Sequence, residues 1–130
     1  MGLTLSFHYQ PDERALVIGF AQGAGIACQA DVDYFSATLS SRCQHVKQRV
    51  HLFFDLGNLT VQADLVESFI EAKRELADRF AQTVWHFGGH LAERVMTRND
   101  CTRRGQKPNL FRTREDAMAA FHKSRASATP

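Results

Sequence analysis

Cysteine is scarce in this chain, and the few that occur are not spaced as metal ligands. Cys28, Cys43 and Cys101 form an odd set without a CxxC pair, so the sequence predicts neither a disulfide framework nor a structural zinc site. No run approaches the roughly 18 apolar residues of a membrane span, and no basic segment followed by an apolar one opens the chain. We therefore expect a cytoplasmic protein without an integral membrane segment.

The motifs of the common enzyme classes are also missing. The chain has no Walker loop, no GxGxxG, no helical HExxH and no Ser or Cys in a nucleophile elbow. The sequence thus predicts no catalytic residue, no metal site and no cofactor, and we expect a protein that is not an enzyme. The formal net charge is only +2. Since the basic residues are not interleaved with aromatic ones for base stacking, we expect no nucleic-acid partner.

Hydrophobic periodicity is what the chain does have, and it alternates between strand and helix spacing. An apolar–polar alternation at the start predicts a hairpin, and later strands alternate with amphipathic helices. The expected strands are 3–9, 15–20, 50–56, 83–87 and 110–111, and the expected helices are about 28–43, 62–80, 91–96 and 113–121. This order, ββαβαβαβα, predicts an α/β fold with a mixed, mainly parallel sheet of about five strands and about four helices.

Domain boundaries follow from the same pattern. Residues 1–123 are expected to form a single domain, residues 97–109 a polar loop and residues 124–130 a flexible tail. The run from Val50 to Leu56 is almost entirely apolar, which is typical of a central strand covered on both faces. We expect Phe53 or Phe54 in this strand to pack against the helix that follows, on the side chains of Leu65, Phe69 and Leu76.

A family resemblance rests on two stretches. Residues 53–64, in which an apolar strand ends at Asp55-Leu56 and leads through a loop into a helix, resemble the Asp-Leu-Ser-Gly-x-x-x-x-Asp-Ser-Ser-Gly core of the STAS domain, the fold of anti-sigma-factor antagonists. Residues 110–118 are similar to the closing strand and helix of that family. The resemblance covers roughly residues 3–123 and implies a STAS-like fold in a divergent, SpoIIAA-like member.

The resemblance implies a signalling module that docks on a protein partner of the regulatory kinase or anti-sigma-factor type. Docking would involve the loop and helix start, with Asn58, Thr60, Gln62, Asp64 and Glu67 as the expected residues. A gap-free alignment from Asp55 places Asp64 on the serine that a kinase phosphorylates in classical members. Asp64 thus carries a fixed charge at the switch position, and Thr60 is the competing phosphoacceptor. The alternative is a first-turn acid that interacts with the helix dipole, typically by about 0.3–1 kcal/mol.

Two other hypotheses remain open. A small-molecule or lipid carrier of the SpoIIAA-like, Sec14-related type would hold its ligand between sheet and helices, where a ligand pocket is expected from Asp55, His86, Gly88, Gly89 and His90. The weaker hypothesis is an enzyme with Asp55, His86 and His90 in its active site. The structural alternative is that the glycines serve turn geometry and that the histidine lies on the surface. A closed apolar cavity would favour the carrier, whereas a filled core with an exposed surface at residues 58–67 would favour docking.

Charge is distributed unevenly along the chain. The segment from Arg94 to Arg114 carries a charge of +6 and the remainder −4. An expected anion patch within it consists of Arg98, Arg103, Arg104 and Lys107. Such a patch attracts phosphate groups, anionic lipid or an acidic protein surface. A solvated basic loop without a ligand accounts for the same pattern.

Overall fold

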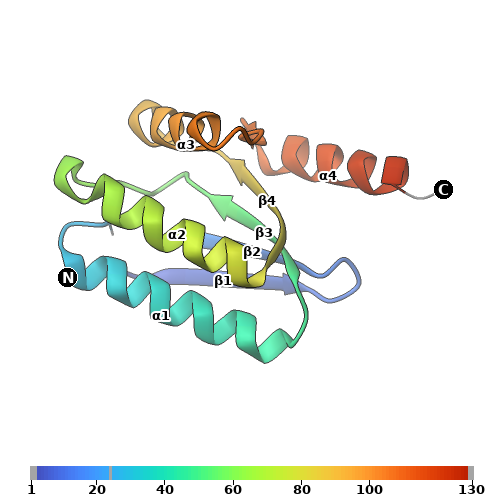
Figure 1. Cartoon of the computed structure of the whole chain (residues 1–130), viewed down its shortest axis with the longest axis horizontal. Coiled ribbons are helices and arrows are strands. Elements are labelled where there is room, and N and C mark those ends of the chain that lie inside the picture. The colour runs from blue at the N-terminus through green and yellow to red at the C-terminus, as the bar shows by residue number, and fades with distance from the viewer. Residues whose placement is uncertain (1–2, 24, 129–130) are drawn as a thin grey trace.

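A five-stranded sheet in the order β1-β2-β3-β4-β5 forms the centre of the molecule (Figure 1). In this computed structural model, which describes residues 3–23 and 25–128, β1 (Leu5–Gln10) and β2 (Ala15–Phe20) form an antiparallel hairpin. The next strands follow in parallel, namely β3 (Val50–Asp55), β4 (Ala81–Phe87) and the short β5 (Leu110–Phe111). The predicted α/β fold with a mixed, mainly parallel sheet and β3 at its centre is confirmed.

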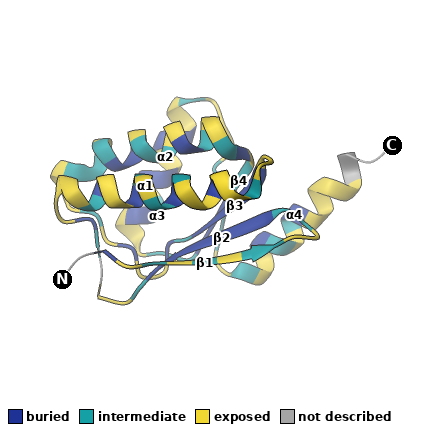
Figure 2. Ribbon diagram, turned by 90° about the horizontal axis from the view of Figure 1, so that it is seen from below, coloured by how far each residue is buried: buried dark blue, intermediate teal, exposed yellow. Residues whose placement is uncertain are grey.

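The helices are distributed over both faces of the sheet (Figures 1 and 2). The crossover connections contain α1 (Gln29–Val46), α2 (Val66–Phe80), preceded by the 3-10 turn η1 (Ala63–Leu65), and α3 (Leu91–Arg103). Because the parallel strands follow one another in sequence order, right-handed crossovers place these helices on one face. The last helix, α4 (Arg114–Ala128), covers the opposite face. Within the described ranges, no helix is long and apolar enough to cross a bilayer.

Neighbouring phenylalanines of β3 point into the two different cores. Phe54 is 1% exposed and lies in the core under α1 and α2. There Phe35 lies between Phe54 and Phe69, with ring centroids 6.4 and 5.0 Å from its own. Leu65 and Leu76 belong to the same cluster, so the prediction that this strand packs against α2 is confirmed.

Phe53 lies on the opposite side of β3 and belongs to the core under α4. Its ring stacks on Trp85 at 6.0 Å and meets Phe121 edge-on at 5.2 Å. Side chains alternate between the two faces along a strand, which explains how two successive residues each serve a different core. Both faces of β3 are therefore closed by apolar side chains, as the uninterrupted apolar run predicts.

The third helix is longer than the sequence predicts. We expected it to end near residue 96 and a polar loop to follow, but α3 continues to Arg103. In its second half, the residues that face the protein interior are polar. Thr97 and Asp100 are buried, and the Thr97 hydroxyl donates a hydrogen bond to the carbonyl of Glu93 at 2.9 Å. Reading burial from apolar residues alone misses a helix whose buried positions are polar.

The last helix also extends beyond its expected end. Residues 124–130 are expected to form a flexible tail, whereas α4 continues to Ala128; residues 129–130 lie outside the described residues. Contacts to the turn between β1 and β2 explain this extension. Arg125 donates to the carbonyl of Glu13 at 3.4 Å, and His122 contacts the Glu13 carboxylate.

Truncation of Phe54 tests the core. Phe54→Ala should lower the free energy of unfolding by about 3–5 kcal/mol, because it leaves a cavity between β3, α1 and α2. Urea unfolding followed by circular dichroism measures the change. Tyr34→Ala, at a position 47% exposed on α1, is the control and should stay within about 1 kcal/mol. An equal loss in both variants would contradict the packing described here.

Candidate functional site: the helix-start face and a basic groove

The loop between β3 and α2 has a rigid base and a polar surface. The Asp55 carboxylate accepts a hydrogen bond from the Gly57 N–H at 2.9 Å, and the Leu59 N–H donates to the Leu56 carbonyl at 3.1 Å. Leu59 is fully buried, while Asn58 and Thr60 on either side of it are exposed. Anchoring through the apolar residue turns both polar neighbours outward.

A second segment fixes the same loop from the side of α1. The Ile26 N–H donates to the Thr60 carbonyl at 2.8 Å, and the Gln62 N–H donates to the Ile26 carbonyl at 3.0 Å. Gly25 allows this approach, since a Cβ atom there would lie 2.2 Å from the Thr60 hydroxyl oxygen. The backbone of residues 58–62 is thus held in place before any partner binds.

Asp64 lies where the sequence places it, at the start of the helical segment after the loop. It is exposed within η1, directly before α2, and Gln62 and Glu67 nearby are exposed as well. Gln62 occupies the N-cap position of η1 and makes no side-chain capping bond. The expected docking residues Asn58, Thr60, Gln62, Asp64 and Glu67 all present exposed side chains along one segment.

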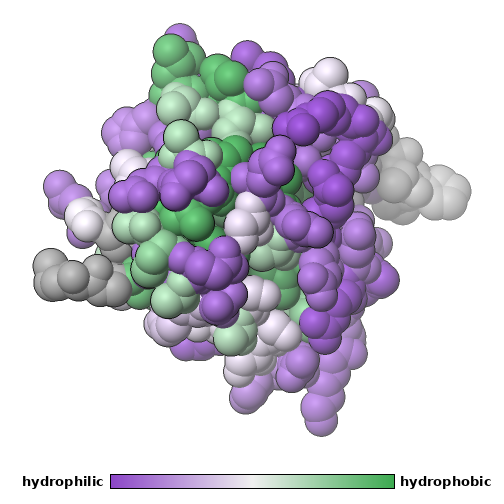
Figure 3. Space-filling view, turned by 60° about the vertical axis from the view of Figure 1, so that its left-hand side comes forward, coloured by the Kyte–Doolittle hydropathy of each residue, from purple (hydrophilic) through white to green (hydrophobic). Residues whose placement is uncertain are grey.

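The start of α1 and the start of α3 adjoin this segment. The Ser68 hydroxyl donates to the Gln29 side chain of α1 at 2.9 Å, and the Val61 N–H donates to the Glu93 carboxylate of α3 at 3.4 Å. On α3, Leu91 is 79% exposed. We call residues 58–67 together with Leu91 the helix-start face. Figure 3, with this end of the molecule turned forward, shows apolar side chains among hydrophilic ones.

The five residues expected to form a ligand pocket do not line a common pocket. Asp55 is engaged with its own loop, and His90 is exposed at the start of α3. Gly88 and Gly89 have φ of 70° and 103° and let the loops after β3 and β4 pack closely, since a Cβ on Gly89 would lie 2.8 Å from that of Leu56. His86 is buried and faces a different region.

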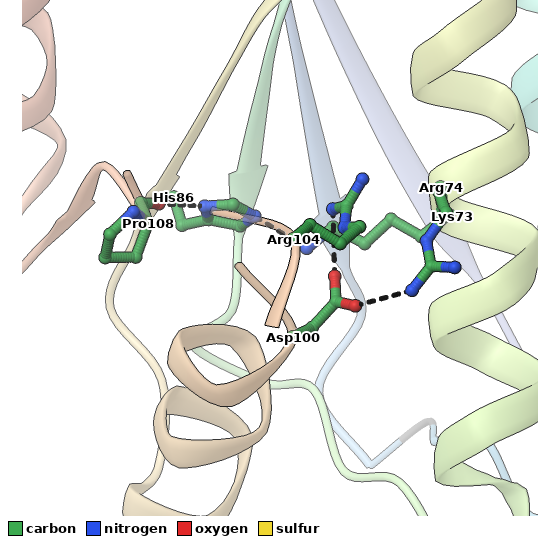
Figure 4. Close-up of polar contacts among 6 residues, drawn as sticks. All are labelled: Lys73, Arg74, His86, Asp100, Arg104 and Pro108. Atoms are coloured by element: carbon green, nitrogen blue, oxygen red, sulfur yellow. Dashed lines mark hydrogen bonds and ion pairs between the residues drawn. The ribbon is translucent and has the colours of Figure 1, made fainter. Parts of the chain in front are cut away.

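His86 is hydrogen-bonded at both ring nitrogens (Figure 4). Its Nδ1 lies 2.8 Å from the Pro108 carbonyl, which can only accept, so Nδ1 carries the proton. Its Nε2 lies 2.6 Å from the Lys73 ammonium and accepts from it. Burial, together with the Lys73 charge, holds the pKa of His86 well below 6.5, so the imidazole is neutral at physiological pH.

Lys73 is a cation without a carboxylate partner among the described residues. Its ammonium contacts the neutral His86 and lies 4.7 Å from the ring centre of Phe54. Burial lowers the pKa of Lys73 to about 8. The available signal was its position, because residue 73 falls between Ile70 and Leu76 within the apolar stripe of α2.

A buried carboxylate lies close to Lys73 but is shared by two arginines. Asp100 on α3 pairs with Arg74 at 3.0 Å and with Arg104 at 2.9 Å (Figure 4). The Nε of Arg104 is buried without a hydrogen-bond partner. Cys101 beside them is buried, and burial raises the pKa of its thiol.

A groove of about 800 Å³ runs along the edge of β4, and its lining includes Lys73, Arg74 and Arg104. β5 pairs only with His86 and Phe87, so the first part of β4 has no neighbouring strand on this side. Lys73 and Ala77 of α2 lie along one side of the groove, and Ala120 and Lys123 of α4 along the other. Trp85 and His86 both line this groove, although successive side chains of a strand face opposite sides, because the groove is open along the edge of β4.

The expected anion patch is divided by this geometry. Arg104 and Lys107 line the groove, whereas Arg98 and Arg103 are exposed elsewhere on α3. Arg49, Lys73, Arg74 and Lys123 are further basic residues of the groove, and Asp78 is the acidic one. In the described part of the chain, no group of three or more His, Cys, Asp or Glu side chains is placed to hold a metal ion.

Comparison with known proteins supports the fold. No protein-family profile and no curated protein sequence matches the chain. Among solved structures, the anti-sigma factor antagonist SpoIIAA in its unphosphorylated form is similar, with a TM-score of 0.60 over 92% of this chain and 97% of SpoIIAA, at 12% sequence identity. The chain has a STAS-like fold. The resemblance inferred from residues 53–64 and 110–118 is thereby confirmed for the fold.

The low pKa of Lys73 predicts how stability depends on pH. An unfolded chain binds the Lys73 proton up to pH 10.5, whereas the folded chain releases it near pH 8. The unfolded state therefore binds more protons between these values, and the Lys73 contribution to stability should rise from pH 8 to 10.5. Lys73→Met should remove this rise, measured as the difference in urea midpoint between variant and parent across that range. Lys107→Met, at an exposed position, should leave the rise in stability unchanged. If the rise also disappeared in Lys107→Met, it would be an effect of net charge and not of Lys73.

Proposed function

We propose that this protein is a non-enzymatic regulatory module that docks on a protein partner through its helix-start face. The observation that carries the proposal is the combination of a fixed backbone and exposed polar side chains at residues 58–67. Preorganised surfaces bind with a smaller loss of conformational entropy. The STAS-like fold, shared with an anti-sigma factor antagonist, supports a partner of the regulatory kinase or anti-sigma-factor type.

The packing of the core supports docking over the carrier hypothesis. The space between the sheet and the helices α1 and α2 is occupied by Phe20, Phe35, Phe54 and Phe69, all at most 4% exposed. A carrier of an apolar molecule needs an enclosed cavity in that place. The groove along β4 is open and basic, which does not suit an apolar ligand.

The charge and composition of the helix-start face indicate the chemistry of its partner. Asp64 and Glu67 are exposed carboxylates at the start of α2, and Leu91 provides a large apolar side chain nearby. Interfaces commonly combine an apolar anchor with a polar rim. We therefore expect a partner surface that carries basic side chains around an apolar pocket.

In this proposal, Asp64 gives the switch position a permanent negative charge. A phosphoserine carries about −1.5 to −2 charges and three acceptor oxygens, so a carboxylate reproduces part of its charge and none of its geometry. The position is charged without a kinase, and control by phosphorylation would pass to Thr60 or be absent. Thr60 is exposed, as a phosphoacceptor must be.

Replacement of Asp64 tests the docking surface. Partners are captured from the source cell with the parent protein, identified by mass spectrometry, and titrated by calorimetry. Asp64→Ser should change the affinity by clearly more than about 0.5 kcal/mol, the usual limit for a surface substitution. Leu91→Ser should weaken the same complex by about 1 kcal/mol or more.

Asp12→Ser is the matched control for this experiment. Asp12 is exposed in the turn between β1 and β2, outside the helix-start face, and its replacement should leave the affinity unchanged. Equal affinities for the parent, Asp64→Ser and Leu91→Ser would show that the captured partner binds elsewhere. Phosphate detected on Thr60 in the native protein would place the switch four residues before Asp64.

A further inference from the structure

We propose that the groove along the open edge of β4 binds a small organic anion, with Lys73 and Arg104 contacting its phosphate or carboxylate group. This site is separate from the helix-start face and independent of the docking proposal. It rests on three observations, which concern charge, an unused hydrogen-bond donor, and shape.

The first observation is the excess of positive charge in the groove. The carboxylate of Asp100 is already shared between Arg74 and Arg104, so it does not neutralise Lys73 as well. The ammonium of Lys73 has instead a neutral imidazole and an aromatic ring as neighbours. Charged groups removed from water are normally paired with an opposite charge, and an anion in the groove provides that charge.

The second observation is the unused donor of Arg104. Its Nη2 is bound to Asp100 at 2.9 Å, which fixes the guanidinium plane, while its buried Nε has no partner. A buried donor without an acceptor costs about 1–3 kcal/mol. The planar fork of arginine suits the oxygens of phosphate and carboxylate groups. Arg104 lines the groove, so an oxyanion bound there is the acceptor that this donor lacks.

The third observation is the size and lining of the groove. A volume of about 800 Å³ lies in the range of small-molecule sites, which is roughly 300–1,000 Å³. Ala77, Val84 and Phe111 add apolar surface to the basic lining. The groove therefore suits a molecule with an anionic group at the Lys73 end and an organic body along β4, rather than a bare ion.

The expected effect of binding is measurable on Lys73 itself. An anion beside the ammonium stabilises its charged form, so binding should raise the pKa of Lys73 from about 8. Inorganic phosphate and citrate serve as separate probes, one for each anionic group, with sodium chloride at equal ionic strength as the screening control. NMR of the lysine side chains measures the pKa, and amide shifts of residues 73, 86 and 104 give the affinity.

Variants separate a specific site from a general attraction. Lys73→Met should weaken the binding of the effective probe about tenfold or more, and Arg104→Lys, which keeps the charge but lacks Nε, should weaken it several-fold. Lys107→Gln at the groove and Lys47→Gln outside it remove equal charge, and only the former should reduce affinity.

The binding of the two probes shows whether the groove is an anion site. Binding of phosphate alone or of citrate alone identifies the anionic group of the ligand and supports the site. The proposal is overturned if chloride causes the same shifts, if Lys73→Met binds as tightly as the parent protein, or if neither probe raises the pKa of Lys73 at millimolar concentration.

Discussion

The alternation of Phe53 and Phe54 on the central strand is the constraint on which the rest of the structure depends. Each residue lies at most 1% exposed in one of two aromatic clusters, and the strand places them on opposite faces because its side chains alternate. A shift of one residue in the register of β3 would exchange the two cores. The position of Asp55 at the end of β3, and hence the path of the loop to Asp64, follows from this register.

A second constraint acts at the boundary between α2 and α3, where polar groups replace apolar packing. Asp100 holds Arg74 of α2 and Arg104 at the end of α3 together, so the carboxylate joins elements that hydrophobic residues alone would not fix. Partly buried ion pairs contribute little net stability after desolvation, but their geometry is specific. Because Asp100 is committed to the two arginines, Lys73 has no carboxylate partner among the described residues, and the groove is basic.

The sequence was a good guide wherever burial is apolar and a poor one wherever burial is polar. The run from Val50 to Leu56 and the stripe of Leu65, Phe69 and Leu76 predicted the central strand, its helix and their contact, because periodicity reports one hydrophobic side. Thr97 and Asp100 continue the helical spacing of Glu93, yet these two polar residues were assigned to a loop. Their spacing, together with Arg74 and Arg104 as counter-charges, was the available signal. The place of Asp64 was predictable from its distance to Asp55, whereas the contact between Lys73 and His86 depends on how α2 crosses β4.

The nearly neutral chain divides into two regions of opposite charge, for which we propose ligands of opposite charge. Exposed carboxylates at the start of α2 suit a basic protein surface, and the groove beyond its middle suits an anion. Both regions include residues of α2, since Glu67 and Lys73 are less than two turns apart. Their charges are nevertheless kept apart, because Lys73 faces His86 and Phe54 while Glu67 faces solvent. A basic partner on the helix-start face would therefore not neutralise Lys73, and an anion in the groove would not mask Asp64.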